Sequence, residues 1–99
     1  MIRYRIEMPQ AVRTLIRQLP PELKSKVKIG LRSIADDPYR AKGLRDELAD
    51  LRSYRIGRFR VIYRIVGSMV QIVALGPRVD IYERAATELS KALRKGKLQ

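Results

Sequence analysis

Hydrophobic and polar residues alternate in two neighbouring segments, residues 54–56 and 59–65, which flank Gly57-Arg58. β-branched and aromatic residues fill both segments, and a glycine at the first of two central positions is typical of a two-residue hairpin turn. The pattern therefore predicts two antiparallel strands. The predicted cross-strand pairs are Ile56 with Phe59, Arg55 with Arg60, and Tyr54 with Val61.

This register gives the hairpin two chemically different faces, because successive side chains of a strand point to opposite sides. The apolar face is predicted to hold Tyr54, Ile56, Phe59, Val61 and the core residue Tyr63. On the other face Arg55 and Arg60 meet across the ladder, where like charges cost about 0.2–1 kcal/mol. A sheet that served only the fold gains nothing from this pair, whereas a bound polyanion would turn the repulsion into attraction.

The same periodicities predict the other elements. Residues 2–7 alternate as a half-buried strand does, and apolar residues recur at helical spacing in residues 10–19. Pro21 is expected to open a second helix, which closes at Asp37-Pro38. The remaining predicted elements are an irregular link over 39–51, a strand over 69–75 that ends at Gly76-Pro77, a short strand over 80–82 and a helix over 83–93.

These elements predict an α+β fold in a single domain, residues 1–99. We expect an N-terminal strand, a helical hairpin, a three-strand antiparallel meander that completes a twisted four-stranded sheet, and a short C-terminal helix. The helical hairpin is expected to cover one face of the sheet, because its apolar stripes need a second layer. The cationic face of the sheet would then lie on the other side.

The chain is strongly basic, with 22 Lys and Arg against 10 Asp and Glu and a net charge of +12. We therefore expect nucleic acid or an acidic protein as partner. No segment approaches the ~20 apolar residues of a membrane span, and the N-terminus lacks the apolar core of a signal peptide, so we expect a cytoplasmic protein with no membrane partner. Between Asp50 and Asp80 there is no carboxylate, and the six arginines there are Arg52, Arg55, Arg58, Arg60, Arg64 and Arg78.

Cysteine and histidine are both absent. Their absence excludes disulfides, thiol nucleophiles, the usual zinc ligands and acid–base catalysis by imidazole. We expect no metal and no other cofactor. Any acid–base chemistry must therefore use other groups.

The run GRFRVIYRI at residues 57–65 is followed by a turn, an apolar strand and the run GPRVDIY at residues 76–82. This pair of motifs resembles the RelE/ParE toxin superfamily, whose common form is G-x-[YF]-R-[VL]-[IV]-Y and, about one strand later, G-[HK]-R-x-[DE]-[IV]-Y. The predicted order of elements is also similar. The resemblance covers nearly the whole chain.

The resemblance implies a toxin with one of two targets. RelE-type members cut messenger RNA in the ribosomal A site by metal-independent attack of the 2′-hydroxyl, and a small acidic antitoxin holds each inactive; operator DNA is bound only through the antitoxin complex. ParE-type members share the fold but act on DNA gyrase, and their second motif tends to lose the tyrosine. Tyr82 and the Arg55/Arg60 pair favour the RelE-like branch. A ParE-like gyrase inhibitor and an inactive, basic nucleic-acid-binding relic are the alternatives.

The resemblance also implies a site. The matched active-site positions are Arg60 as the catalytic strand arginine, Arg78 at the end of the following strand, Tyr82 as the C-terminal tyrosine, and Arg55 on the preceding strand. Ser53 stands where the RelE branch carries a second basic residue, and Pro77 where relatives often carry another. Arg52 lies one residue from Ser53, so a bulge could bring it round. Further contacts with RNA are expected from Arg52, Arg58 and Arg64.

Cleavage of RNA without a metal needs a proton acceptor for the 2′-hydroxyl, a proton donor for the leaving 5′-oxygen and stabilisation of the phosphorane. Arg60 and Arg78 can present bidentate donors to the non-bridging oxygens. Tyr82 could stack on a base or exchange a proton, and the sequence leaves both roles open.

Overall fold

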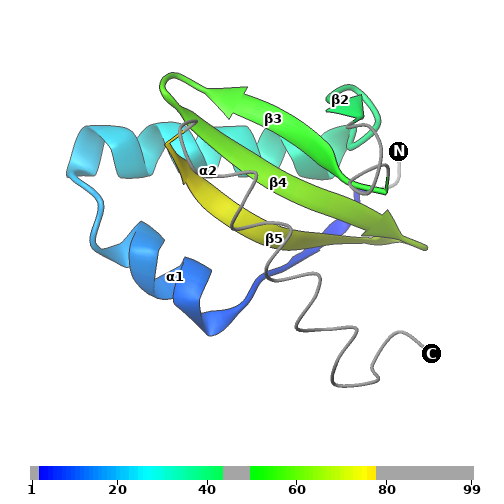
Figure 1. Cartoon of the computed structure of the whole chain (residues 1–99), viewed down its shortest axis with the longest axis horizontal. Helices are drawn as coiled ribbons and strands as arrows, with labels where there is room; N and C mark the ends of the chain where they lie inside the picture. Colours follow the sequence, from blue (N-terminus) through cyan, green and yellow to red (C-terminus); the bar gives the residue numbers. More distant parts are fainter. Residues whose placement is uncertain (1–2, 44–49, 78–99) are drawn as a thin grey trace.

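Figure 1 shows a β-sheet with two helices against one face in the computed structural model, which describes residues 3–43 and 50–77. The elements are β1 (Arg5–Glu7), α1 (Gln10–Arg17), α2 (Pro21–Asp36), β2 (Lys42–Gly43), β3 (Arg52–Ile56), β4 (Phe59–Val66) and β5 (Met69–Pro77). The sheet order is β1-β5-β4-β3-β2; β1 is parallel to β5 and the other neighbours are antiparallel. The predicted α+β fold is confirmed, and the two-residue β2 adds a short edge strand.

Two predicted elements lie outside the described residues: the strand over residues 80–82 and the helix over residues 83–93. Neither helix of the described part is long and apolar enough to cross a membrane.

The β3–β4 hairpin has the predicted register. Ile56 pairs with Phe59, Arg55 with Arg60, and Tyr54 with Val61. Gly57 has a φ of +59°, a left-handed conformation that costs residues with a Cβ roughly 1–2 kcal/mol. A glycine is therefore what allows this tight turn to join the two strands.

The hydrophobic core lies between the helices and the apolar face of the sheet. Val27 and Ile34 of α2 are buried there against Val61 and Tyr63 of β4. Tyr63 has no exposed surface, and its hydroxyl donates a hydrogen bond of 2.5 Å to the carbonyl oxygen of Pro38. The predicted core role of Tyr63 is confirmed, and its hydroxyl also fixes the segment that follows α2.

α1 is shorter than predicted. It ends at Arg17, and the N–H of Leu19 bonds to the carbonyl oxygen of Ile16 in a tighter turn. The residue before a proline is disfavoured in the helical region, so the helix ends two residues earlier than the apolar pattern predicts.

β5 and the link before β3 also differ from the prediction. β5 continues through Gly76 to Pro77, because a proline that is the last residue of a strand removes no later ladder bond. The link over 39–51 is not irregular throughout, since Lys42 pairs with Ser53 and Gly43 with Arg52.

A bulge interrupts the ladder between β4 and β5. Ile62 pairs with Ala74 but Tyr63 pairs with Ile72, so Val73 is an extra residue on β5. The bulge shifts the alternation of β5, so that Ile72 before it and Leu75 after it both belong to the core.

The sheet face turned away from the helices also has buried residues. Ile62 has no exposed surface, and Ser53 and Ala74 are each 6% exposed. The pairing places these three side chains in one row across β3, β4 and β5. The sequence predicts Arg55 and Arg60 on this face but not its buried row; in the structure Arg60 and Arg64 lie on either side of that row.

Candidate anion-binding site

Arg55 and Arg60 lie together on the sheet face turned away from α1 and α2. They are direct cross-strand partners, and alternation places them opposite the core residues Ile56 and Val61. The Cβ atoms of such partners are about 4.5–5.5 Å apart. Arg55 is exposed and Arg60 is half-buried. The predicted juxtaposition of these two cations is therefore confirmed.

The two guanidinium groups turn away from each other. Nε of Arg55 donates a hydrogen bond to the carbonyl oxygen of Gly57 at 3.2 Å, toward the turn. Nη1 of Arg60 donates to Oγ of Ser53 at 3.1 Å, in the opposite direction along the strands. This divergence lowers the repulsion between two cations that the register holds side by side.

Neither arginine is neutralised by a carboxylate in the part of the chain that the structure describes. The ion pairs there join Arg3 to Asp36 at 3.0 Å and Arg40 to Asp37 at 3.7 Å, and both are exposed. The positive charge of Arg55 and Arg60 therefore remains available to an anion.

Arg64 lies on the same face, four residues further along β4, which is about 13 Å at 3.3 Å per residue. Its Nε donates to Oε1 of Gln71 at 2.8 Å, and Nε2 of Gln71 donates to Oε1 of Glu7 at 3.2 Å. The three side chains thus form a polar row across β4, β5 and β1. Arg58 is exposed in the β3–β4 turn, at the other end of the strand.

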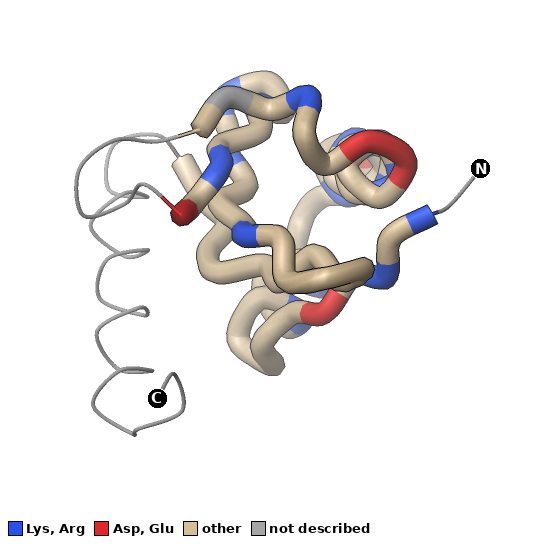
Figure 2. Tube along the Cα trace, turned by 90° about the vertical axis from the view of Figure 1, so that its right-hand side faces the viewer, with Lys and Arg blue, Asp and Glu red and all other residues tan. Residues whose placement is uncertain are grey.

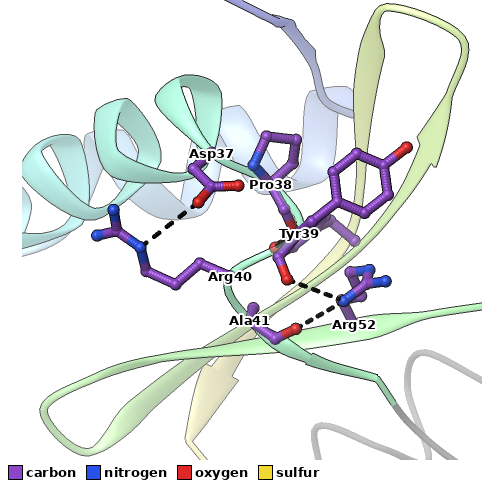
Figure 3. Close-up of polar contacts among 7 residues, drawn as sticks. Asp37, Pro38, Tyr39, Arg40, Ala41 and Arg52 are labelled. Atoms are coloured by element: carbon purple, nitrogen blue, oxygen red, sulfur yellow. Dashed lines mark hydrogen bonds and ion pairs between the residues drawn. The ribbon is translucent and has the colours of Figure 1, made fainter.

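Arg52 lies on the opposite, helix-covered face. Its Nη1 donates to the carbonyl oxygens of Tyr39 at 3.3 Å and Ala41 at 2.8 Å. Its guanidinium carbon lies 5.1 Å from the centre of the Tyr39 ring. Figure 3 shows the two hydrogen bonds of Arg52 to this segment. β3 pairs regularly with β4, so no bulge brings Arg52 beside Arg60. The structure does not place Arg52 with the other sheet arginines.

Arg78 and Tyr82 lie outside the described residues, so their predicted positions beside Arg60 stay predictions. Ser53 is the site residue that the sequence analysis missed, because it was considered only as a lost charge. The predicted register contained enough information to find it. Ser53 is two residues before Arg55 on β3, so its side chain lies on the same face as that of Arg55. It is therefore a diagonal cross-strand neighbour of Arg60, within reach of the Arg60 side chain.

A second cationic feature lies between α1 and α2. A groove of about 360 Å³ is lined by the apolar residues Met8, Ile16 and Leu31 and by the basic residues Arg13, Arg17, Lys24 and Lys28. The three apolar residues pack against the core. No acidic residue is among the described residues that line the groove, and Figure 2 shows basic positions spread over the described trace. The groove is therefore suited to an anionic, amphipathic partner.

The sequence profile of the ParE toxin family of type II toxin–antitoxin systems, parDE, matches residues 2–82. No functionally curated protein matches the chain. Among solved structures, the toxin–antitoxin complex RelBE2 from Mycobacterium tuberculosis is similar, with 30% identity and a TM-score of 0.68 over 78% of this chain and 100% of that chain.

Two further solved structures are similar in fold. A mutant of the Escherichia coli toxin RelE in the free state has a TM-score of 0.71 at 17% identity, over 87% of this chain and 97% of that chain. An archaeal RelE–RelB complex from Pyrococcus horikoshii has a TM-score of 0.64 at 23% identity, over 79% and 98%. At these identities the likeness concerns the fold alone.

Proposed function

The chain belongs to the RelE/ParE toxin superfamily of type II toxin–antitoxin systems, and we propose that it is a ribosome-dependent endoribonuclease that cuts messenger RNA. The observation that carries the proposal is the cross-strand pair Arg55–Arg60 on the face turned away from the helices. Arg60 is half-buried and bonds a neutral hydroxyl. Its charge can therefore act on a phosphodiester.

In the proposed reaction the 2′-oxygen of a ribose bonds to the adjacent phosphorus, and the bond from that phosphorus to the 5′-oxygen of the next nucleotide breaks. The 2′-hydroxyl gives its proton to an acceptor and the leaving 5′-oxygen takes one, so the products are a 2′,3′-cyclic phosphate and a 5′-hydroxyl. Arg60 donates N–H groups to the non-bridging oxygens, whose negative charge grows in the phosphorane. Arg55, its cross-strand partner, adds a second positive charge on the same face of the sheet.

Arg78 and Tyr82 take the roles that the family resemblance implies. Arg78 would be a second donor to the phosphate, and Tyr82 would stack on a base or exchange a proton. The ribosome would orient the message, and such orientation can lower a barrier by several kcal/mol, on the order of 7–11 in favourable cases.

A second candidate function is inhibition of DNA gyrase by binding alone. The match to the ParE family profile favours it. Tyr82, which the ParE motif tends to lose, and the Arg55–Arg60 pair favour the ribonuclease.

Induced expression in a bacterial host distinguishes these functions. The ribonuclease should stop protein synthesis rapidly and leave new cuts in translated messages, with 5′-hydroxyl ends on the downstream fragments. A gyrase inhibitor should instead cause filamentation and DNA damage while messages stay intact. Harmless expression of a folded protein would contradict both functions and indicate an inactive relic.

Arg60→Ala tests the site directly. It should lower the rate of cleavage by about 100- to 1,000-fold and abolish toxicity without changing the fold, because the lost group acts on the phosphate. Arg32→Ala is the matched control, since it removes the same charge from an exposed position of α2, and it should remain toxic. Cleavage by Arg60→Ala at the rate of the unmodified protein would contradict the proposed site.

The proposed partner is a small acidic antitoxin. The solved structures from M. tuberculosis and P. horikoshii are complexes of RelE-type proteins with RelB-type proteins. The groove between α1 and α2 suits an amphipathic segment, whose apolar side chains would contact Ile16 and Leu31 while its carboxylates meet Arg17 and Lys24. Antitoxin and RNA would then occupy different faces of the toxin.

A further inference from the structure

Ser53 holds the side chain that the proposed function depends on. It is 6% exposed, and its Oγ accepts a hydrogen bond of 3.1 Å from Nη1 of Arg60. In the β3–β4 ladder Ser53 pairs with Ile62, and Arg60 pairs with Arg55. The contact is therefore a diagonal one between neighbouring strands, on the face turned away from the helices.

A hydroxyl differs from a carboxylate as a partner for this arginine. It fixes one end of the guanidinium through a charge-assisted hydrogen bond but does not neutralise its charge. A guanidinium has five N–H donors in a planar fork, so an arginine bound at Nη1 keeps donors for the two oxygens of a phosphate. Ser53 can thus orient Arg60 without competing with the substrate for its charge.

The direction of the contact also matters. Arg55, the cross-strand partner of Arg60, is held toward the turn by the carbonyl oxygen of Gly57. The Ser53 hydroxyl draws Arg60 the other way. Without it, no described contact would keep the Arg60 guanidinium apart from a like charge directly across the ladder.

We propose that Ser53 is a positioning residue, which aims the Arg60 guanidinium at the phosphodiester. The inference rests on the proposed ribonuclease function. Ser53 stands where the RelE branch carries a basic residue, so the position would serve here by orienting a cation instead of supplying one. Two consequences distinguish this role from a lost charge: removing the hydroxyl should slow cleavage, and adding a lysine should not speed it.

The test measures cleavage of a defined message on purified ribosomes with the toxin in excess, which separates the maximal rate from the half-saturating concentration. Ser53→Ala should lower the maximal rate by about 10- to 100-fold, as misplacement of a catalytic group does, with half-saturation unchanged. Ser53→Thr keeps a hydroxyl and should restore the rate. Ser68→Ala is the control, because it makes the same chemical change in the exposed β4–β5 turn.

A second measurement separates positioning from mere support of the fold. In an Arg60→Ala background, Ser53→Ala should cause no further loss of rate, because Ser53 acts through Arg60. An additional loss would overturn the inference.

NMR of the arginine side chains gives an independent test. In the unmodified protein, the Arg60 guanidinium should rotate slowly and give separate Nη signals. In Ser53→Ala these signals should average into one, and unchanged signals would overturn the inference.

The two levels of the proposal fail in different ways. If the unmodified toxin does not cut the message, or Arg60→Ala cuts it equally fast, the ribonuclease proposal fails and the inference on Ser53 fails with it. If Arg60→Ala is inactive but Ser53→Ala cuts at the full rate, or Ser53→Lys cuts faster than the unmodified toxin, only the positioning role is overturned.

Discussion

At the scale of single residues, Tyr63 shows how burial decides the role of a polar side chain. It lies in the first family motif, yet it is completely buried and donates to the carbonyl oxygen of Pro38. Burial raises the pKa of Tyr63 from 10.0 to about 12, and Arg52 lowers it only in part. A phenol held this way supports the fold and does not exchange protons with a substrate.

The raised pKa of Tyr63 predicts a loss of stability in alkali. Below pH 10 the phenol is protonated in both folded and unfolded chains, so its contribution is fully present. Between pH 10 and pH 12 only the unfolded chain loses the proton, and the free energy of unfolding should fall by up to about 2 kcal/mol. Urea unfolding of the native protein and Tyr63→Phe, measured from pH 8 to pH 12, checks this.

Tyr63→Phe provides the comparison because lysines also titrate in this range. At pH 8 the variant should be less stable by about 1 kcal/mol, the value of one hydrogen bond. The difference between the two proteins should shrink above pH 10 and change sign before pH 12. A constant difference up to pH 12 would contradict the raised pKa.

Arg52 is a residue whose surroundings favour stability over binding. Its guanidinium bonds the carbonyl oxygens of Tyr39 and Ala41 and stacks on the Tyr39 ring. Arg52→Ala should lower the free energy of unfolding by about 2 kcal/mol, since two charge-assisted hydrogen bonds are lost. Chemical denaturation measures this loss. Arg58→Ala, in the exposed turn, should change stability by less than about 0.5 kcal/mol, and an equal effect of the two would contradict the assignment.

At the scale of elements, the close approach of α2 to β3 depends on Gly30. A Cβ at this position would lie 2.5 Å from Cδ1 and 2.9 Å from Cγ1 of Ile56. Alanine favours a helix by about 1 kcal/mol over glycine, but overpacking a core costs about 1–3 kcal/mol. Gly30→Ala should therefore destabilise the protein by about 1 kcal/mol in thermal or urea unfolding.

Ile56→Val removes the methyl group that the new Cβ would strike first. In that background the cost of Gly30→Ala should vanish or change sign, a coupling that a double-mutant cycle measures. If Gly30→Ala costs the same in both backgrounds, the contact with Ile56 does not set the distance between α2 and β3.

The hairpin could be predicted from sequence because its determinants are local. Gly57 fixes the turn, the turn fixes the register, and the register places Arg55 beside Arg60. The bulge at Val73 could not be predicted in this way, because no local residue pattern distinguishes it from regular alternation. Its evidence is the pairing between β4 and β5, which depends on the packing of the whole sheet.

Only the part of the candidate site that depends on local sequence could be predicted. The pairing of Arg55 with Arg60 follows from the turn, but the assignment of Arg52 depended on an irregularity in β3 that the structure does not have. The partners of Arg52 come from the segment after α2, which showed no clear period. The burial of Ile62 was likewise not predicted, because its two nearest neighbours on the same face of β4 are the arginines Arg60 and Arg64.

At the scale of the whole molecule, two groups of basic residues in the described part of the chain lie on different surfaces. Arg55, Arg60 and Arg64 lie on the face of the sheet turned away from the helices, and the cations of the groove between α1 and α2 lie on the helix side. If RNA and antitoxin use different surfaces, mutations should separate toxicity from neutralisation. Arg60→Ala should lose cleavage and keep the antitoxin.

Charge reversal in the groove should have the opposite effect. Lys24→Glu with Lys28→Glu replaces two lining cations and should slow association of an acidic antitoxin by about tenfold or more at low salt, since such charges act mainly on the association rate. Cleavage of messages should stay at its full rate. The control is Lys26→Glu with Arg32→Glu, which reverses the same number of charges at exposed positions of α2 outside the groove lining.

Stopped-flow association at several salt concentrations, beside the ribosomal cleavage assay, measures both effects on the same preparations. Added salt should reduce the difference between the native protein and the double variant, because the Debye length falls from about 10 Å at 0.1 M to about 3 Å at 1 M. If the double variant lost cleavage and antitoxin binding together, the helix-covered side would also take part in binding the ribosome. Equal effects of the double control and of the groove variant would instead mean that the net charge, and not the groove, draws the antitoxin to the toxin.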